Sequence, residues 1–336
     1  MRQYQFNGRD GYDGIDRLAL VDRPDPTVGE HDILIRMRAA SLNYRDLMTA
    51  RGARGSAAPA GLVPLSDGAG EVVAIGARVT RFKAGDRVCP LFFPNWIGGD
   101  ANGSKTFAAL GGSVDGVLSE LVLCDEGSAV SAPEHLSWEE AATLPCAALT
   151  AWSALYGPRP LKCGESVLTL GTGGVSCFAI QFAKAAGATV ISTSSSDAKL
   201  DTARKLGADH LINYMRTPDW EAEVAKLTGG AGVDHVIEVG GGETMAKSVR
   251  SVAMGGQIHM IGVLSNGAIN PVSLIAFKTV RGLMVGSRSD FEAMNRALAA
   301  HRIKPVIDRV FDFEQAGDAY RHLASAAHVG KVVIRV

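Results

Sequence analysis

The sequence predicts an α/β protein built from a doubly wound parallel sheet and a second, mostly β unit. From Glu165 onward, apolar strand-like segments alternate with amphipathic helical segments, which is typical of a parallel sheet with helices on both faces. Before that point, short strand-like segments follow one another closely between Gly, Asp and Pro turn signals. The length of 336 residues suits two domains better than one.

The first part of the chain has strand-like segments at 33–38, 70–75 and 117–122, and a turn at 85–88 that leads into a further strand. Few helical patterns interrupt them, which favours a compact, barrel-like β unit. The last segment, 330–336, is also strand-like, and one strand cannot form a domain by itself. We therefore expect a first domain at 1–147, completed by 280–336, and a sheet domain at 148–279.

Helical signals begin at Ser137, which is an expected N-cap, and Glu140 completes a capping box. A second helix is expected at 149–156. The sheet domain then has expected strands at 166–170, 189–193, 210–213, 235–238, 256–261 and roughly 282–286. Its expected helices are 176–186, 197–206, 219–228, 243–251 and 274–279, and a further helix is expected at 290–301.

Charge and cysteine usage exclude several classes of protein. The 34 Lys and Arg residues balance 35 Asp and Glu, so no overall field attracts nucleic acid or an anionic membrane. No apolar run is long enough to span a bilayer, and the first residues lack the layout of a secretory signal. Five scattered cysteines without a CxxC pair argue against a disulfide framework. We expect a cytoplasmic protein whose partner is a small-molecule substrate.

A nucleotide-binding turn is the strongest local signal. The apolar strand 166–170 runs directly into a Gly-rich turn and then into a helix, which is the setting in which a GxGxxG-like motif is informative. Glycines allow a pyrophosphate to approach the backbone, and the helix N-terminus favours its charge. Ser176 stands where the third glycine of the motif is usual. The alternative is a tight turn without a ligand; the expected contacts are Gly171, Thr172, Gly173, Gly174 and Val175.

The end of the second strand of the sheet domain indicates which cofactor binds. A carboxylate there would accept hydrogen bonds from the ribose of NAD. The chain instead has Ser194, Ser195 and Ser196, followed by Lys199, and hydroxyls with a cation suit a 2′-phosphate. Asp197 is interpreted as a first-turn helix residue. The sequence therefore favours NADPH, although a solvated serine turn with a surface lysine remains the alternative.

Several motifs together resemble the medium-chain dehydrogenase/reductase superfamily along nearly the whole chain. They are Asn43-Tyr44-Arg45-Asp46, the segment 65–72, Gly85-Asp86-Arg87-Val88, the segment 144–151 and Gly330-Lys331-Val332-Val333. The resemblance implies a Rossmann dinucleotide-binding domain and a GroES-like catalytic domain.

Departures from the superfamily pattern indicate which branch of the superfamily the chain resembles. Zinc-dependent members hold their catalytic metal with Cys, His and Cys, and the matching positions here carry Asn43, Ser66 and Cys146. Amide and hydroxyl groups are poor zinc ligands. The four-cysteine lobe of those members is also absent. The chain therefore resembles the zinc-free, quinone oxidoreductase-like branch, with no metal site expected.

The resemblance implies further cofactor contacts. Tyr214 resembles the tyrosine that packs beside the 2′-phosphate in relatives that use NADPH. Turns that follow other strands, and a helix hydroxyl, would complete the site. These residues are Thr150, Gly240, Gly241, Ile261, Gly262, Val263, Ser287 and Arg288, and the alternative for most of them is an ordinary turn.

Without a metal, the protein must supply hydrogen-bond donors where negative charge develops. Asn43 offers an amide and Tyr44 a hydroxyl, and we expect them to be the catalytic pair; the alternative is a structural turn. Phe92, Phe93 and Trp96 would form the wall of an apolar substrate pocket, or else cover the core.

The expected reaction is zinc-independent, NADPH-dependent hydride transfer to an activated C=C, as in an enone or a quinone. A zinc-free NADP-dependent alcohol dehydrogenase or carbonyl reductase is the first alternative. An NADPH-binding protein with a structural or sensing role is the second. The resemblance also implies a homodimer formed through the edge of the parallel sheet.

Overall fold

The computed structural model describes residues 1–7, 14–52, 58–262 and 264–336. The chain divides into two compact units, Met1–Leu149 with Gly286–Val336, and Thr150–Val285. The strand β13 (Thr279–Gly282) pairs with β12 (Val252–Met260), so residues 280–285 belong to the second unit rather than to the C-terminal segment of the first.

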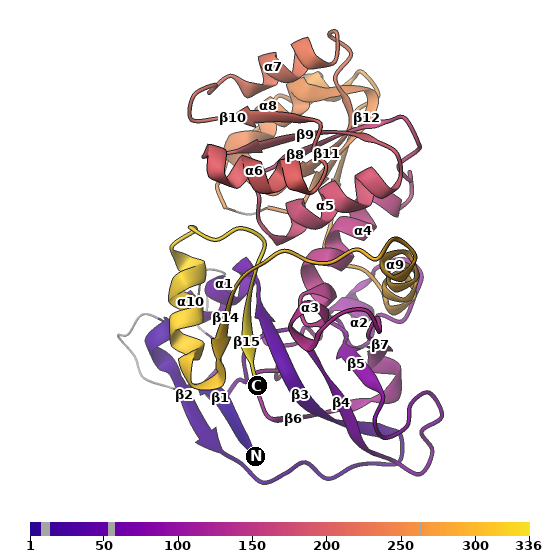
Figure 1. Cartoon of the computed structure of the whole chain (residues 1–336), viewed down its shortest axis with the longest axis vertical. Helices are drawn as coiled ribbons and strands as arrows, with labels where there is room; N and C mark the ends of the chain where they lie inside the picture. Colours follow the sequence, from indigo (N-terminus) through magenta and orange to yellow (C-terminus); the bar gives the residue numbers. More distant parts are fainter. Residues whose placement is uncertain (8–13, 53–57, 263) are drawn as a thin grey trace. The chain divides into compact units, whose positions relative to one another are not determined.

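The first unit is mostly β, as the sequence predicted. Its main sheet has the order β14-β15-β3-β4-β5-β7, with β6 paired to β3, and β1 and β2 form a separate antiparallel pair (Figure 1). The C-terminal strand β15 lies between β14 and β3, so the end of the chain completes this unit. The strand expected at 117–122 begins later, at Leu121. The strands are β1 (Arg2–Phe6), β2 (Leu18–Asp22), β3 (Asp32–Leu42), β4 (Asp67–Ile75), β5 (Arg87–Pro90), β6 (Leu121–Asp125), β7 (Ala129–Ser131), β14 (Ile307–Asp312) and β15 (Lys331–Arg335).

Helices of four to fourteen residues and short 3₁₀ or π-helical turns join these strands. Asn43 precedes α1, and Ser137 caps α3 in the expected capping box with Glu140. A core that includes Phe6, Ile35 and Tyr320 fills the space between sheet and helices. The helices are η1 (Gly14–Arg17), α1 (Tyr44–Arg51), α2 (Gly103–Thr106), η2 (Glu126–Ser128), α3 (Trp138–Ala141), the π-helical turn η3 (Leu144–Ala148), α9 (Arg288–His301), η5 (Phe313–Gln315) and α10 (Ala316–Ala324).

The second unit is a six-stranded parallel sheet with the order β10-β9-β8-β11-β12-β13, which is the doubly wound arrangement of a Rossmann domain. Helices α5 and α6 lie against one face and α7 and α8 against the other (Figure 1). Its elements are α4 (Leu149–Tyr156), β8 (Ser166–Leu170), α5 (Gly174–Ala185), β9 (Thr189–Ser194), α6 (Asp197–Lys205), β10 (His210–Asn213), α7 (Trp220–Leu227), β11 (Val233–Glu238), α8 (Gly242–Ser251), β12, η4 (Pro271–Leu274) and β13.

Two expected elements near the end of this unit were wrong. The helix expected at 274–279 is only the short 3₁₀ turn η4, and the strand expected at roughly 282–286 lies earlier, at β13. The segment is short and its apolar residues are exposed, among them Ile275 and Phe277. Only a few side chains of the segment, Leu274 and Val280 among them, pack against the core of the unit, which is too few to produce a clear hydrophobic period.

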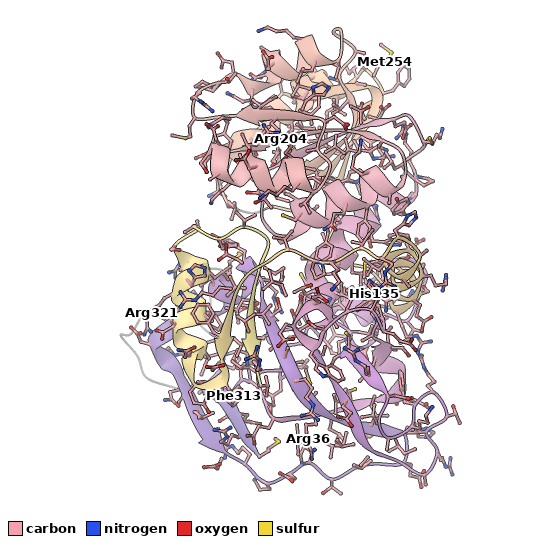
Figure 2. The ribbon with its side chains drawn as sticks, viewed as in Figure 1. Arg36, His135, Arg204, Met254, Phe313 and Arg321 are labelled. Atoms are coloured by element: carbon pink, nitrogen blue, oxygen red, sulfur yellow. The ribbon has the colours of Figure 1, made fainter. Side chains whose placement is uncertain are left out.

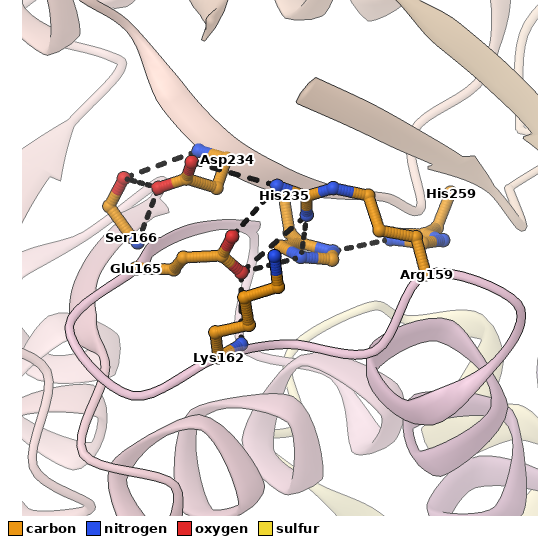
Figure 3. Close-up of polar contacts among 7 residues, drawn as sticks. All are labelled: Arg159, Lys162, Glu165, Ser166, Asp234, His235 and His259. Atoms are coloured by element: carbon orange, nitrogen blue, oxygen red, sulfur yellow. Dashed lines mark hydrogen bonds and ion pairs between the residues drawn. The ribbon is translucent and has the colours of Figure 1, made fainter. Parts of the chain in front are cut away.

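A buried polar cluster joins the start of β8 to the middle of the sheet (Figure 3). His235 on β11 and His259 on β12 are stacked and fully buried, and Nδ1 of His235 lies 3.0 Å from Nε2 of His259. Nη1 of Arg159 lies 2.6 Å from Nε2 of His235, and Glu165 lies 3.3 Å from the same nitrogen. Since a guanidinium only donates, the shorter contact makes Nε2 of His235 an acceptor and places its proton on Nδ1.

That assignment determines the state of the second ring. Nδ1 of His235 donates to Nε2 of His259, so the proton of His259 is on its own Nδ1. This Nδ1 is buried and has no hydrogen-bond partner among the described residues. Both histidines are thus neutral in the folded protein, and burial lowers the pKa of His259 to about 3.

Of the helices in the described part of the chain, none combines the length and apolar character that a bilayer crossing requires.

Candidate functional site

The Gly-rich turn between β8 and α5 has the geometry of a phosphate cradle. Gly171 has φ of +70°, a conformation that favours glycine, and Gly173 is the N-cap of α5. A Cβ atom on Gly171 or Gly173 would meet no protein atom within 4 Å. Packing within the protein therefore does not require a glycine at 173, and the open space in front of it fits a ligand group that approaches the backbone. The residues present fit a dinucleotide pyrophosphate.

The departure at the third glycine position has a local explanation. The Ser176 side chain is buried, and its hydroxyl donates to the carbonyl oxygen of Leu170 at 2.8 Å. The serine thus bonds to the end of β8 and leaves the turn accessible. Its presence does not disrupt the motif.

The structure brings the expected 2′-phosphate residues together at the ends of β9 and β10. The backbone N–H of Tyr214 donates to the carbonyl oxygen of Ser194 at 3.1 Å. Ser196 caps α6 and accepts from the N–H of Lys199 at 3.4 Å. The hydroxyl of Ser194 lies 3.2 Å from that of Thr172 and is buried, so it links this region to the Gly-rich turn.

Sequence reasoning missed Arg216 in this region. Asp197 lies directly beside the serines, where its carboxylate would repel a phosphate. Its Oδ1 accepts hydrogen bonds from Asn213 Nδ2, at 2.9 Å, and from the Arg216 guanidinium. These two partners lower the pKa of Asp197, with the Asn213 hydrogen bond the larger cause. The same three side chains help to line a surface depression of about 400 Å³.

The turns after β11 and β12 are organised around Glu238, which sequence reasoning also missed. The buried carboxylate accepts from the N–H groups of Gly240 and Gly241, at 2.8 and 3.0 Å, and from the hydroxyls of Thr244 and Ser248. Its carbonyl oxygen accepts from Ile261 and Gly262 N–H at 2.9 Å.

Close packing accounts for the glycine at 262. A Cβ there would come within 2.0 Å of the Val239 backbone. Packing thus explains this glycine, and a cofactor contact at 240–262 stays a prediction. Val263 lies outside the described residues.

The remaining expected cofactor residues belong to other elements. Thr150 is buried near the start of α4. Ser287 and Arg288 belong to the first unit, where Ser287 caps α9 through Asp290 and Arg288 donates to the carbonyl oxygen of Gly127 at 3.0 Å. These contacts give both side chains a structural role, and their part in cofactor binding stays a prediction.

In the first unit, three strand ends bring polar side chains together around Asn43. The end of β3, the start of β4 and the start of β15 are adjacent, because Ser41 pairs with Asp67 and Leu42 pairs with Val332. Asn43 follows β3, Asp67 begins β4 and Lys331 begins β15.

The contacts among these side chains are specific. The Lys331 ammonium donates to the carbonyl oxygen of Leu42 at 2.6 Å and to Oδ1 of Asn43, and it lies 3.7 Å from Oδ2 of Asp67. Oδ1 of Asp67 accepts from the Ser66 hydroxyl at 2.8 Å, and Oδ2 accepts from the Cys146 N–H at 3.1 Å. Nδ2 of Asn43 is buried and has no hydrogen bond of normal geometry among the described residues.

Two buried carboxyls flank Asn43. Burial raises the pKa of Asp67, and the charge of Lys331 is the largest opposing effect. Burial likewise raises the pKa of Asp46 to about 6, although the Arg45 charge and the Asn43 N–H oppose the increase. That N–H donates to Oδ2 of Asp46 at 2.7 Å, which closes the first turn of α1.

Tyr44, the second expected catalytic residue, is 48% exposed at the start of α1. Its neighbour Arg45 donates to the carbonyl oxygen of Leu110 at 2.5 Å and lies over the Phe92 ring at 4.7 Å. The predicted aromatic wall is therefore connected to the Asn43 segment through Arg45.

The three aromatic residues of that wall are buried side chains. Phe92 and Phe93 meet edge to face at 4.6 Å, and Phe93 lies 6.2 Å from Trp96, whose Nε1–H donates to the carbonyl oxygen of Gly99. This packing gives them a core role, which was the alternative interpretation, and a contact with substrate stays a prediction.

The donor set near Asn43 does not fit the zinc that dehydrogenases of this superfamily can hold. Only Cys146 among the three matching positions is a zinc ligand type, and burial with the neighbouring Asp67 charge raises the pKa of its thiol. The Lys331 ammonium lies within the cluster and would repel a cation. Over the described residues, no group of three or more His, Cys, Asp or Glu side chains is arranged to hold a metal ion.

Two protein-family models match this chain, and together they cover segments of both units. Residues 29–134 match the model of the alcohol dehydrogenase GroES-like domain, and residues 174–300 match that of the zinc-binding dehydrogenase. The chain belongs to the medium-chain dehydrogenase/reductase superfamily. Its members are oxidoreductases, and membership implies a nicotinamide cofactor.

Individual proteins show the same relationship. A zinc-type alcohol dehydrogenase-like protein of Schizosaccharomyces pombe is 44% identical over 97% of both chains. A chloroplast envelope quinone oxidoreductase homolog of Arabidopsis thaliana is 28% identical over 99% of this chain and 98% of its own.

Solved structures agree with this fold. A protein of Sinorhizobium meliloti 1021, provisionally named an alcohol dehydrogenase, has a TM-score of 0.92 and 42% identity, covering 100% of this chain and 98% of its own. An NAD-dependent alcohol dehydrogenase has a TM-score of 0.90 and 32% identity over 100% of both chains.

Proposed function

We propose that the chain is a zinc-independent, NADPH-dependent oxidoreductase that transfers hydride to the activated C=C of an enone or quinone. The observation that carries this proposal is the buried Nδ2 of Asn43, an amide donor that has no hydrogen bond of normal geometry among the described residues, although it lies close enough to Asp67 to lower the pKa of that carboxyl. Buried donors are nearly always paired, and an unpaired one at a candidate catalytic position suits an oxygen of the substrate.

The chain's own residues carry the proposed binding and polarisation. The Gly-rich turn would hold the pyrophosphate, and Ser195, Ser196, Lys199 and Tyr214 would surround the 2′-phosphate. When bound, NADPH supplies the hydride. As the β-carbon of an enone accepts it, the π bond breaks and negative charge moves to the carbonyl oxygen, where the Asn43 N–H would stabilise it. The exposed Tyr44 hydroxyl is the proposed donor of the proton that completes the saturated product.

Zinc independence rests on the chemistry of the donor set. Asn43 and Ser66 offer neutral oxygen or nitrogen, and Lys331 already supplies a positive charge to the buried Asp67. A neutral amide polarises a carbonyl less than a metal does, and an activated C=C needs only such modest assistance. Enones and quinones are therefore favoured over isolated alcohols.

The choice of NADPH rests on the absence of a carboxylate at the end of β9 and on the pairing of Asp197. The Arg216 guanidinium and the Asn213 amide occupy Oδ1 of that carboxylate, which reduces its repulsion of a phosphate.

The alternative of a zinc-free alcohol dehydrogenase or carbonyl reductase is favoured by the names of the relatives, several of which are alcohol dehydrogenases. In that case the same Asn43 amide would polarise the carbonyl that accepts the hydride. The second alternative is not an enzyme: it is a protein that binds NADPH for a structural or sensing role.

We also propose a homodimer that forms along β13. This strand is the edge of the sheet, and the segment around it exposes apolar side chains, including Met254 at 73% (Figure 2), Ile275 at 75% and Phe277 at 80%. A second copy of the same edge would cover them. Light scattering of the protein and of Phe277→Asp tests this: the proposal requires a dimer that the substitution weakens.

A cytoplasmic location is proposed from the five cysteines, none of which is in a disulfide in the described part of the chain. The balanced charge supports a small-molecule substrate rather than nucleic acid or a membrane.

The direct test is NADPH oxidation by the purified protein with a quinone, an enone, an aldehyde and a ketone, each measured beside NADH. Turnover fastest with the quinone or enone is the expected result. Turnover confined to the aldehyde or ketone would favour the carbonyl reductase, and tight NADPH binding without turnover on any of the four would favour the binding protein.

A further inference from the structure

Lys331 is the buried cation nearest the proposed donor, and its contacts are unusual for a lysine. Its side chain is 3% exposed and is held by the Leu42 carbonyl oxygen, Oδ1 of Asn43 and the Asp67 carboxylate. Lysine is seldom fully buried unless it is paired, because an ammonium loses much hydration in the interior. Three acceptors therefore hold the ammonium, two at the end of β3 and one at the start of β4.

The ammonium selects one orientation of the Asn43 amide. An ammonium has only donors, so it must face the amide oxygen and not the amide nitrogen. With Oδ1 held by Lys331, Nδ2 points away from that contact. It is this nitrogen that is buried without a normal hydrogen bond.

Asp67 holds Lys331 in turn. Its carboxylate is fully buried and is itself fixed by the Ser66 hydroxyl and the Cys146 N–H. The contacts therefore form a series. Ser66 and Cys146 fix Asp67, the Asp67 carboxylate holds Lys331, and Lys331 holds Oδ1 of Asn43. Nδ2 of Asn43 ends the series: it has no hydrogen bond of normal geometry among the described residues, although the Asn43 amide also interacts with Asp67 and lowers the pKa of that carboxyl.

We propose that Lys331 is a positioning residue that holds the Asn43 amide with its N–H directed to the oxygen of the substrate. This inference rests on the proposed function. If the ammonium is removed, the amide is free to turn by half a rotation and present its oxygen, which would repel the developing negative charge. A neutral substitution should therefore lower kcat and leave the KM for NADPH nearly unchanged, since the nucleotide turn belongs to the second unit.

The test compares Lys331→Met, Lys331→Arg and Asn43→Ala with the double variant Lys331→Met/Asn43→Ala. We expect Lys331→Met to lose about tenfold or more in kcat with a KM for NADPH within about twofold, as for removal of an interaction made in the transition state. Lys331→Arg should recover part of the loss, because a guanidinium also only donates. The double variant should be no slower than Asn43→Ala alone, since without the amide there is nothing to orient.

A purely structural role for Lys331 predicts a different pattern. The losses of the two single variants would then multiply in the double variant, and this outcome would overturn the inference. Unchanged kcat in Lys331→Met would overturn it too. If Lys331→Met does not fold, the comparison of Lys331→Gln with Lys331→Arg applies the same criterion. Lys304→Met, which removes a lysine paired with Glu140 on the surface, is the matched control.

The proposed function and this inference fail separately. Turnover that is unaffected by Asn43→Ala would remove the catalytic role of the amide itself. A loss in Asn43→Ala together with normal turnover in Lys331→Met would keep the proposed function and reject only the role of Lys331.

Discussion

The stability of the second unit should decrease steeply as the pH falls below neutrality, because His259 is buried in its neutral form. In the unfolded chain the imidazole has its ordinary pKa of 6.5, and in the folded protein its pKa is about 3. Burial is the main cause, followed by the interaction with the neighbouring His235 ring and by the charges of Arg281 and Arg159. Glu165 and Asp234 also face this cluster and act on His235 in the opposite direction, but the pKa of His235 is still lowered.

The sign of the effect follows from proton uptake on unfolding. Between pH 6.5 and about 3 the unfolded chain binds a proton at His259 that the folded protein does not. Stability from this group is therefore fully present above pH 6.5 and is lost as the pH falls, by about 1.4 kcal/mol per pH unit. Lowering the pH from about 7 to about 5 should cost about 2 kcal/mol from His259 alone.

Hydrogen exchange of peptides from β11 and β12 measures this local stability without interference from the first unit. The variant His259→Gln is the critical comparison, because its side-chain oxygen can accept from Nδ1 of His235 and it does not titrate. We expect its pH dependence to be shallower by about 1.4 kcal/mol per unit. His135→Gln removes a histidine of the first unit and controls for the loss of an imidazole. Equal slopes in the wild type and His259→Gln would refute the reasoning.

Three other predictions concern the candidate sites. Gly173→Ala should fold normally, because a Cβ there meets no protein atom within 4 Å, but it should weaken NADPH binding about tenfold or more. Gly103→Ala, where a Cβ would also meet open space, is the control. Equal NADPH affinity in the two variants would contradict the proposed phosphate-binding role of the Gly-rich turn. Lys199→Ala should raise the KM for NADPH more than that for NADH, because only NADPH carries the 2′-phosphate; an equal effect on both would remove that role. Asn43→Ala and Tyr44→Phe should each lower turnover while calorimetry finds NADPH affinity retained; unchanged turnover in both would make this segment structural.

Local patterns predicted most of the fold. The strands β8 and β10 were predicted with their observed bounds; β8 is a buried, mostly apolar run, and β10 is a short Leu-Ile pair between polar residues with turns at its ends. The capping box at Ser137 is likewise a property of four consecutive residues. The edge strand β13 and the turn η4 were misplaced because the apolar residues between them, Ile275 and Phe277, are exposed and do not mark the buried face of an element.

The candidate site was only partly predictable, because its key contacts are distant in sequence. Asn43 and Lys331 are 288 positions apart, and only the pairing of β15 with β3 brings them together. Arg216 was missed for a related reason, since its partner Asp197 was interpreted as a helix residue alone. Glu238 had a usable local signal: a carboxylate that ends an apolar strand and precedes three glycines has backbone N–H groups within reach.

Metal dependence tests the account's central claim most directly. NADPH oxidation with a quinone or enone should be measured on one preparation before and after chelation, with zinc determined in the same samples. We predict turnover that survives chelation and does not follow the zinc content. Turnover that disappears with the chelator and returns on addition of zinc would contradict the claim that the Asn43 amide, and not a metal ion, polarises the substrate.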